Sequence, residues 1–196
     1  MRKRWWPGVV MLMIASVPAA AAASDWYAFA EAGTMWSFRR SNHDEVEFGD
    51  EPGGSIAAGL GRRYSLDIRW RLAAEGQLIG QVIPLHGRND KREATADGRE
   101  FWLAGVTVNG WPEYALSDRC SLYAGGGLGP AIIAAFGSST TTLLAIAGVG
   151  VRLQANDELT LDLGGRYYWT APADLEGARS EYDSFGPSFR LTWFLR

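Results

Sequence analysis

The 196-residue chain carries 19 Lys and Arg against 22 Asp and Glu, which gives a formal net charge of −3. A chain of this length forms one domain, or one domain with a cleaved leader. The acidic balance argues against a nucleic-acid partner, which needs a basic stripe. The only cysteine, Cys120, excludes an internal disulfide.

The first 23 residues have the three parts of a secretory signal peptide. Cations at positions 2–4 precede an apolar core (8–17) and an alanine run (19–23) that offers cleavage sites. The core is shorter than the roughly 20 residues that a membrane-spanning helix needs. We therefore predict removal of 1–23, export, and a mature domain of 24–196 with a formal charge of −6 (−3 minus three cations).

Beyond the leader, apolar and polar residues alternate with a period of two in eight segments, which is typical of β-strands. The expected strands cover 25–38, 54–64, 67–82, 100–111, 121–136, 141–154, 159–170 and 184–196. The fifth strand contains Pro130, which predicts a bulge, and its pattern does not decide which face is apolar. No apolar run after the leader is long enough for a transmembrane helix.

The connections between these strands alternate in length. Those after the first, third and seventh strands are long and charged, and those after the second, fourth and sixth are shorter: 39–53, 83–99 and 171–183 against 65–66, 112–120 and 155–158. The fifth connection (137–140) is a short exception. Short turns at one end and long loops at the other predict an all-β fold, an eight-stranded antiparallel up-and-down transmembrane β-barrel.

The charged residues indicate which face of the strands points inward. A soluble calycin-like barrel has an apolar interior, whereas an outer-membrane barrel has a polar lumen and an apolar outer band. Charges that lie opposite the larger apolar faces would pair with one another in a narrow lumen. The predicted lumen charge cluster is Glu31, Arg69, Arg71, Glu75, Arg152, Asp162, Arg166 and Arg190.

Aromatic residues stand at the ends of the apolar faces, where membrane interfaces favour Trp and Tyr. The predicted aromatic girdle is Trp26, Trp36, Tyr64, Trp70, Trp102, Tyr167, Trp169 and Trp193. Ten residue steps on a strand tilted by about 40° climb roughly 25 Å, the height of the apolar band. Trp26 and Trp36 would then mark the two interfaces, and Glu31 would lie mid-membrane, facing a lumen arginine.

Two runs carry a family resemblance: LYAGGGLGPAIIA (122–134) and GVGVRLQANDELTLDLGGRYYW (148–169). They resemble the eight-stranded outer-membrane β-barrel superfamily, which contains opacity-type surface proteins and the OmpA transmembrane domain. The resemblance covers the mature chain, most clearly 101–196, and marks fold better than function. It implies a Gram-negative outer-membrane location and contact with outer-membrane lipid, lipopolysaccharide and the outer-membrane assembly machinery. Such chains usually end in an aromatic, whereas this one ends WFLR, which moves that signal to Trp193 or Phe194.

Some barrels of this superfamily are enzymes that modify lipid A, and these enzymes are deacylases or palmitoyltransferases. The deacylases would place a His-x-Ser pair where this chain has Tyr168-Trp169-Thr170. The palmitoyltransferases use His, Asp and Ser at the outer rim, and the only histidines here, His43 and His86, fall in predicted long loops. We expect a non-enzymatic protein, with a lipid A-modifying enzyme as the alternative.

No nucleotide, zinc or calcium pattern appears, so we expect no cofactor and no metal site. The acidic first and last long loops are read as a repulsive outer surface rather than as a cation site. Side chains fill an eight-stranded lumen, which argues against a wide channel and leaves a narrow pore open. The expected role is in envelope structure or surface attachment. The loops leave an extracellular ligand undecided.

Overall fold

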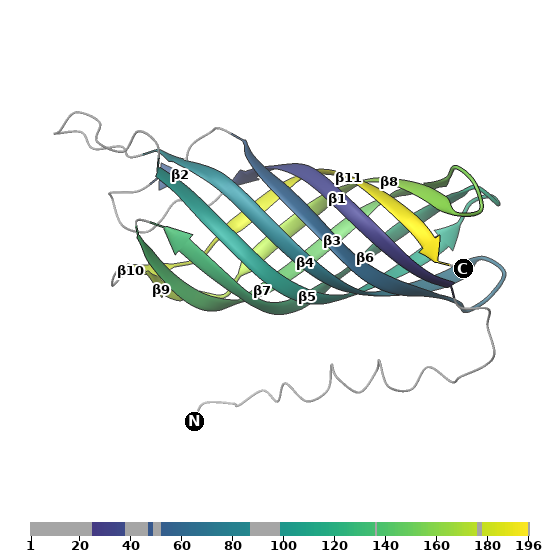
Figure 1. The fold of residues 1–196 in the computed structure, drawn as a ribbon, viewed down its shortest axis with the longest axis horizontal. Coiled ribbons are helices and arrows are strands. Elements are labelled where there is room, and N and C mark those ends of the chain that lie inside the picture. The colour runs from purple at the N-terminus through teal and green to yellow at the C-terminus, as the bar shows by residue number, and fades with distance from the viewer. Residues whose placement is uncertain are drawn as a thin grey trace, which may run out of the picture.

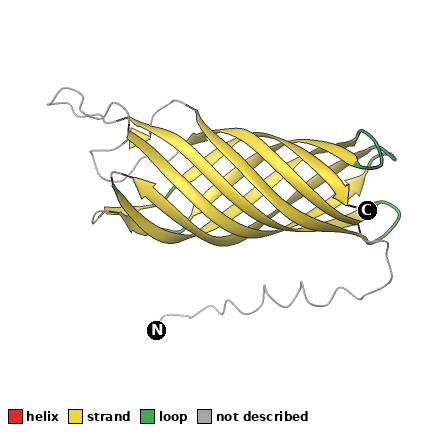
Figure 2. Cartoon of the chain, viewed as in Figure 1, coloured by secondary structure: helices red, strands yellow, loops and turns green. Residues whose placement is uncertain are grey.

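The structure, a computed structural model, describes residues 25–37, 47–48, 52–86, 99–135, 137–175 and 178–195. The predicted leader and His43 lie outside the described residues. Within them, every regular element is a β-strand (Figure 2). None of these residues belongs to a helix long and apolar enough to cross a membrane.

Eight long strands form a closed barrel (Figure 1). Each strand pairs antiparallel with the next one along the chain, and β11 closes the barrel by pairing with β1. The predicted eight-stranded antiparallel up-and-down barrel is confirmed. The strands are β1 (Asp25–Ser37), β3 (Gly53–Ser65), β4 (Trp70–His86), β5 (Arg99–Ala115), β6 (Cys120–Ala135), β7 (Ser138–Gln154), β8 (Leu159–Thr170) and β11 (Asp183–Leu195).

Three short strands extend one end of the barrel. β2 (Glu47–Phe48) pairs with the end of β4, and β9 (Ala173–Leu175) pairs with β10 (Ala178–Ser180) inside the last connection. None of them was expected, because segments of two or three residues show no periodicity. The strand β4 is also longer than expected, so that His86 ends a strand and does not lie in a loop.

The two ends of the barrel differ in their connections. At the turn end, three tight turns (66–69, 116–119 and 155–158) lie beside the start of β1 and the end of β11. Each turn is closed by the same bond, in which the first N–H donates to a carbonyl four residues on, at 2.9, 2.9 and 3.0 Å in chain order. The opposite end, called the loop end below, carries the longer connections. The predicted alternation of short and long connections is confirmed, together with its short exception at the loop end, where only 136–137 separate β6 from β7.

The bulge expected at Pro130 is wrong. The pairing of β6 with β7 runs without a break from Cys120 to Ala135. On its other side β6 keeps one register with β5, and the pairing is interrupted at 129–130, which includes the proline, and at 124–125. Proline has no N–H to donate. The strand therefore alternates throughout, with Tyr123 and Ile133 facing inward and Leu128 and Ile132 facing outward.

Inward-facing glycines make room for aromatic rings in the narrow interior. Gly61 pairs with Tyr27 across β1 and β3, and a Cβ on Gly61 would overlap the Tyr27 ring. Gly150 stands in the same relation to Tyr123 across β6 and β7. The high glycine content is therefore partly a packing requirement of the lumen.

Candidate functional site

Eight charged side chains are buried inside the barrel, between its turn end and its middle. They comprise four carboxylates and four guanidinium groups, so the lumen charge cluster is balanced: Glu31, Glu75, Glu113 and Asp162 with Arg63, Arg152, Arg166 and Arg190. Alternation along the strands places them inward while the apolar neighbours of each face outward.

Glu31 lies at the centre of the cluster, between two arginines. Arg166 forms a bidentate pair with it, Nε to Oε1 at 3.0 Å and Nη2 to Oε2 at 3.0 Å. Arg190 donates its Nε to Glu31 Oε2 at 2.7 Å from the position directly opposite on β11. The carboxylate expected mid-membrane therefore has two cations. Charge-assisted bonds of this geometry are among the strongest in proteins.

Glu75 on β4 extends the cluster toward β5. Its Oε1 accepts bonds from Arg190 Nη1 at 2.7 Å and from the Tyr27 hydroxyl at 2.8 Å. Its Oε2 accepts a bond from Trp111 Nε1 at 2.7 Å. Both carboxylate oxygens of a side chain that is 2% exposed are thus bonded, which a buried charge requires.

A second group of ions lies nearer the turn end. Arg152 on β7 forms a bidentate pair with Asp162 on β8, at 2.8 Å from Nε and 2.6 Å from Nη2. Its Nη1 contacts Glu113, whose Oε1 also lies 3.4 Å from Arg63 Nε. Four strands are joined by this chain of charges.

Aromatic rings fill the space between the guanidinium groups. The Arg190 guanidinium carbon lies 4.1 Å from the centre of the Phe29 ring, and that of Arg166 lies 4.5 Å from the centre of the Trp111 ring. At the turn end, Arg63 stands over Phe194 at 4.6 Å. These cation–π contacts pack the lumen as well as neutralising it.

The structure brings together six of the eight residues predicted for the cluster and moves the other two. Arg69 is a correction: it is exposed in the turn 66–69, because β4 begins only at Trp70. Its Nη1 donates a hydrogen bond to the Tyr114 hydroxyl at 3.1 Å, and this bond raises the pKa of Arg69. Arg71 is half-buried at the turn-end mouth of the lumen and forms no ion pair within the described ranges.

Sequence reasoning missed Arg63 and Glu113. The fourth strand was predicted to end at residue 111, yet β5 continues to Ala115 and carries Glu113 inward. Arg63 alternates correctly with its neighbours, but the adjacent Arg62, which faces outward, obscured the pattern. A longer alternation window across Pro112 would have found Glu113.

The loop-end half of the lumen is mainly apolar, which was not expected, although neutral polar side chains such as Gln81 and Ser184 are also buried there. Its buried apolar side chains pack between the charge cluster and the longer connections: Met35, Ile83, Phe101, Leu103, Ile133, Leu144 and Tyr182. The rings of Phe101 and Tyr182 lie 4.8 Å apart. A polar layer separates the two halves, where Asn109 Nδ2 donates to Gln77 Oε1 at 2.8 Å.

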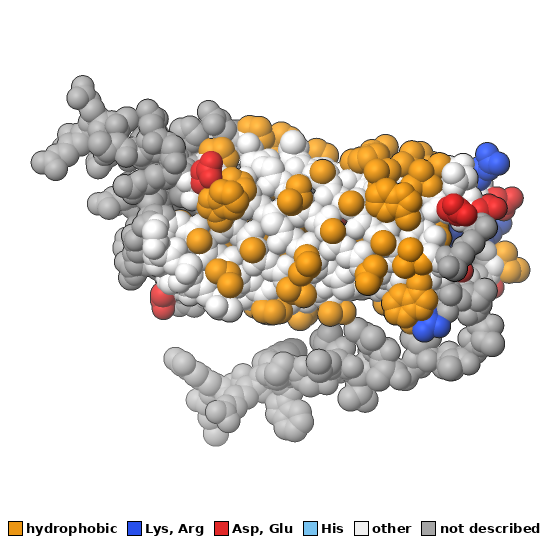
Figure 3. Space-filling view, in the orientation of Figure 1, with side chains coloured by type: hydrophobic (Ala, Val, Ile, Leu, Met, Phe, Trp, Pro, Cys, Tyr) orange, Lys and Arg blue, Asp and Glu red, His pale blue; other side chains and the backbone are white. Residues whose placement is uncertain are grey.

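The residues predicted for the aromatic girdle face outward in two groups. Four lie toward the turn end and four toward the loop end: Trp26, Tyr64, Trp70 and Trp193, then Trp36, Trp102, Tyr167 and Trp169. Trp169 is half-buried and donates its Nε1 to Glu181 at 2.8 Å. Between the groups the outer wall is apolar, and Figure 3 shows hydrophobic side chains along it, with charges gathered at the turn end.

The segment 168–170, where a lipid A deacylase would carry its His-x-Ser pair, has a structural role here. Tyr168 is buried in the lumen, and the Thr170 hydroxyl accepts a bond from the Tyr182 N–H at 3.0 Å. Across the described part of the chain, no group of three or more His, Cys, Asp and Glu is placed to hold a metal ion.

Comparisons with known proteins add to this geometry. No protein-family model matches the sequence, and no curated protein matches it. Among solved structures, Neisserial surface protein A superposes with a TM-score of 0.53 at 14% identity, over 87% of this chain and 97% of that one. The fold is that of the eight-stranded outer-membrane barrels.

The outer membrane enzyme PagL superposes equally well, with a TM-score of 0.53 at 14% identity over 84% of this chain and 97% of its own. One similar structure is thus a surface protein and the other an enzyme. A shared fold at this identity does not choose between the two roles, so function must be argued from this chain's own residues.

Proposed function

We propose that the mature chain is a non-enzymatic outer-membrane barrel with a closed lumen and a role in envelope structure or surface attachment. The observation that carries this proposal is the outer wall, whose large apolar side chains lie between two groups of outward aromatics. Short turns are typical of the periplasmic side and long loops of the outer surface. We therefore assign the turn end to the periplasm.

The wall is too apolar to be a water-facing surface. Ile56, Val108 and Val149 are each at least 61% exposed, and they belong to an apolar surface that surrounds the barrel. Soluble monomers rarely expose contiguous apolar patches larger than a few hundred Å². In lipid this surface is favourable, and a closed barrel leaves no backbone edge unpaired. Outer-membrane lipid and lipopolysaccharide are therefore the proposed partners of the wall.

The filled lumen supports a closed barrel. Among the described residues, paired charges occupy the turn-end half and mainly apolar side chains occupy the loop-end half. The interior of an eight-stranded barrel is just wide enough for such side chains to fill it. A narrow pore, the remaining alternative, would require the charge cluster to break. We therefore expect the purified protein to conduct no ions in a planar bilayer.

The assembly machinery is a further proposed partner. Of the two aromatics near the C-terminus, Trp193 is exposed on the outer wall, whereas Phe194 packs inside against Tyr27 with ring centres 5.7 Å apart. An outward ring is the one that a receptor in the membrane can reach, so we assign the recognition role to Trp193.

Accessibility labelling tests the membrane placement. In a Cys120→Ser background, single cysteines at the adjacent positions 108 and 109 would face lipid and lumen respectively. A lipid-soluble maleimide should modify the Val108→Cys variant and spare the Asn109→Cys variant. Labelling at 109 alone would overturn the orientation. Identical gel mobility before and after boiling would count against a detergent-resistant barrel.

Lipid A analysis tests the non-enzymatic role. His43→Ala and His86→Ala remove the only histidines of the chain. Wild-type protein expressed in an outer membrane should leave the lipid A mass spectrum unchanged. A new lipid A species that appears with the wild type and disappears with either variant would establish the enzymatic alternative.

A further inference from the structure

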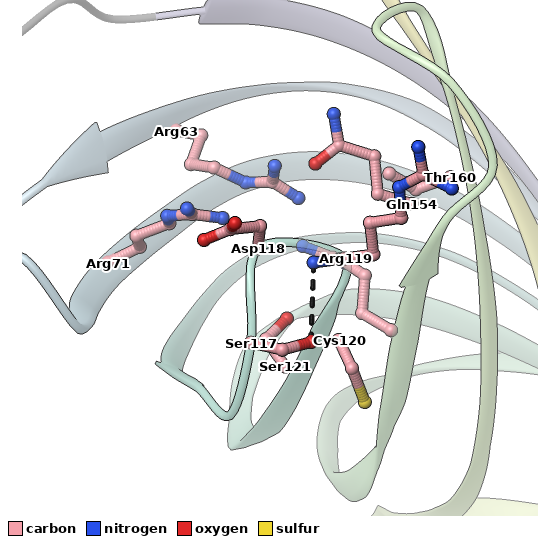
Figure 4. A pocket seen from close by; sticks show the side chains of 10 residues that line it. Arg63, Arg71, Ser117, Asp118, Arg119, Cys120, Ser121, Gln154 and Thr160 are labelled. Carbon is pink, nitrogen blue, oxygen red and sulfur yellow. Dashed lines mark hydrogen bonds between the residues drawn. The ribbon is translucent and has the colours of Figure 1, made fainter.

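The turn-end mouth of the lumen contains a hollow lined mainly by basic and polar side chains. It has about 220 Å³ of empty space, including the part open to solvent. Four guanidinium groups and one carboxylate line it: Arg63, Arg71, Arg119 and Arg152 with Asp118. Arg63 and Arg71 project from neighbouring strands toward the turn that carries Asp118 and Arg119 (Figure 4).

The positive charge of this mouth is only partly neutralised. Arg152 is paired with Glu113 and Asp162, which lie behind it in the lumen. Arg71 and Arg119 form no ion pair with any residue that the structure describes. Counting the four arginines against Asp118, Glu113 and Asp162 leaves the mouth with one excess positive charge (4 minus 3).

Three buried polar atoms at the hollow also have no hydrogen-bond partner. The Thr160 hydroxyl belongs to a side chain that is 1% exposed, and Arg63, 8% exposed, leaves its Nη2 and its Nε without a hydrogen bond, although Nε lies 3.4 Å from Glu113 Oε1. Buried polar groups are nearly always bonded, so each such atom calls for a ligand or an ordered water. A guanidinium and a hydroxyl together donate to an oxyanion, and the surrounding arginines supply the attraction.

From these observations we infer that the turn-end mouth is a binding site for a single small oxyanion, a phosphate or a carboxylate group. Arg63 and Thr160 form the floor of the site, and Arg71 and Arg119 form its rim. The enclosed part of the hollow holds about one water, so the oxyanion would bind partly in the open mouth, between the rim arginines. The binding itself is independent of the proposed function, which only places this mouth on the periplasmic side.

Calorimetric titration of the refolded mature chain in a phosphate-free non-ionic detergent tests the site. Inorganic phosphate, acetate and chloride are titrated separately at constant ionic strength. We expect saturable millimolar or tighter binding of phosphate, acetate or both, and none of chloride. A phosphate-only response identifies a phosphate group, and an acetate-only response a carboxylate such as a peptide terminus. Absence of saturable binding of both, or equal binding of chloride, would overturn the inference.

Variants separate this site from general basicity. The double variant Arg71→Gln/Arg119→Gln should raise the oxyanion Kd by about tenfold or more, because it removes two charged donors. Arg62→Gln is the matched control, since Arg62 neighbours Arg63 but faces outward, and its Kd should match the wild type. Equal effects of the two changes would contradict the site.

Thr160→Val keeps the shape of the side chain and removes only its hydroxyl. The urea midpoint should not fall, because the lost hydroxyl has no partner, while the oxyanion Kd should rise several-fold. An unchanged Kd in this variant would show that Thr160 is not part of the floor of the site. An ordered water would then be the partner of its hydroxyl.

Discussion

The two halves of the lumen are filled by opposite chemistry. Toward the turn end, ions such as Glu31 and Arg190 pair inside the barrel, and toward the loop end, side chains such as Leu103 and Ile83 form an apolar core. The charged half depends on every member having a partner, because an unpaired buried ion is unfavourable. The apolar half depends on volume, because an unfilled space loses contacts. The barrel interior is therefore filled in two ways: the charged half is destabilised when an ion loses its partner, and the apolar half when side-chain volume is lost.

Removing one cation from the charged half should have the largest effect on stability. Arg190→Met deprives Glu31 of one partner, and it deprives Glu75 of the one cation that the described residues place at bonding distance. We expect the free energy of unfolding in lipid to fall by about 3–5 kcal/mol, the usual penalty for a buried charge left without its partner. Urea unfolding followed by tryptophan fluorescence measures it.

The outward Arg62→Met variant is the control and should lose about 1 kcal/mol or less, the range of an exposed cation–π contact. Adding Glu75→Gln to Arg190→Met removes the charge left without a cation and should recover part of the loss. Equal stability of Arg190→Met and the wild type would mean that the cluster is not what holds the turn-end half together.

The apolar half should respond through cavity formation. Leu103→Ala removes part of a side chain that is 1% exposed, and we expect a loss of about 2–5 kcal/mol, as for other buried leucines. Leu128→Ala, on the outer wall, should cost less than half as much, because lipid fills the space. The same urea titration compares them, and equal losses would show that the loop-end half is loosely packed.

The sequence predicted the barrel because lumen and lipid impose opposite chemistry on alternate residues. The facing of Glu31 and of the Trp26–Trp36 pair follows from a period of two over one strand. Pairing partners did not follow, because they depend on the register between strands that are far apart in sequence. Glu31 had five candidate arginines, and only closure of β11 on β1 places Arg190 opposite it.

The errors in the site arose at strand ends. Arg69 shares the parity of Arg71, so alternation assigned it inward, but parity has no meaning in the turn before Trp70. Glu113 was missed because the predicted strand stopped at residue 111, whereas β5 continues to Ala115. The apolar loop-end half was missed for another reason: inward apolar residues such as Leu103 give a strand two apolar faces, and a contrast between faces then disappears.

A charge placed on the outer wall extends the comparison from the two halves of the lumen to the inside and the outside of the barrel. Val108→Arg puts a charge on the lipid face near the middle of β5, where the expected loss is about 2–4 kcal/mol. Ile132→Arg lies near Trp102 and the loop-end interface, where about 0–1 kcal/mol is expected. Unfolding from lipid vesicles measures both. Equal losses would place the apolar band elsewhere on the wall.

A small effect is also expected at the turn-end aromatics, where the lipid-facing wall meets water. The Arg62 guanidinium carbon lies 5.6 Å from the centre of the Trp26 ring and 5.2 Å from that of Tyr64. Trp26→Leu keeps an apolar side chain but removes one ring, so we expect a loss of about 0.5–1 kcal/mol. A double-mutant cycle with Arg62→Gln isolates the contact, since the coupling disappears if either partner is absent.

A coupling energy near zero would mean that Trp26 acts through lipid alone. Coupling of the expected size would show that outward arginines next to the interface are held by the girdle in the same way that inward arginines are held by lumen rings.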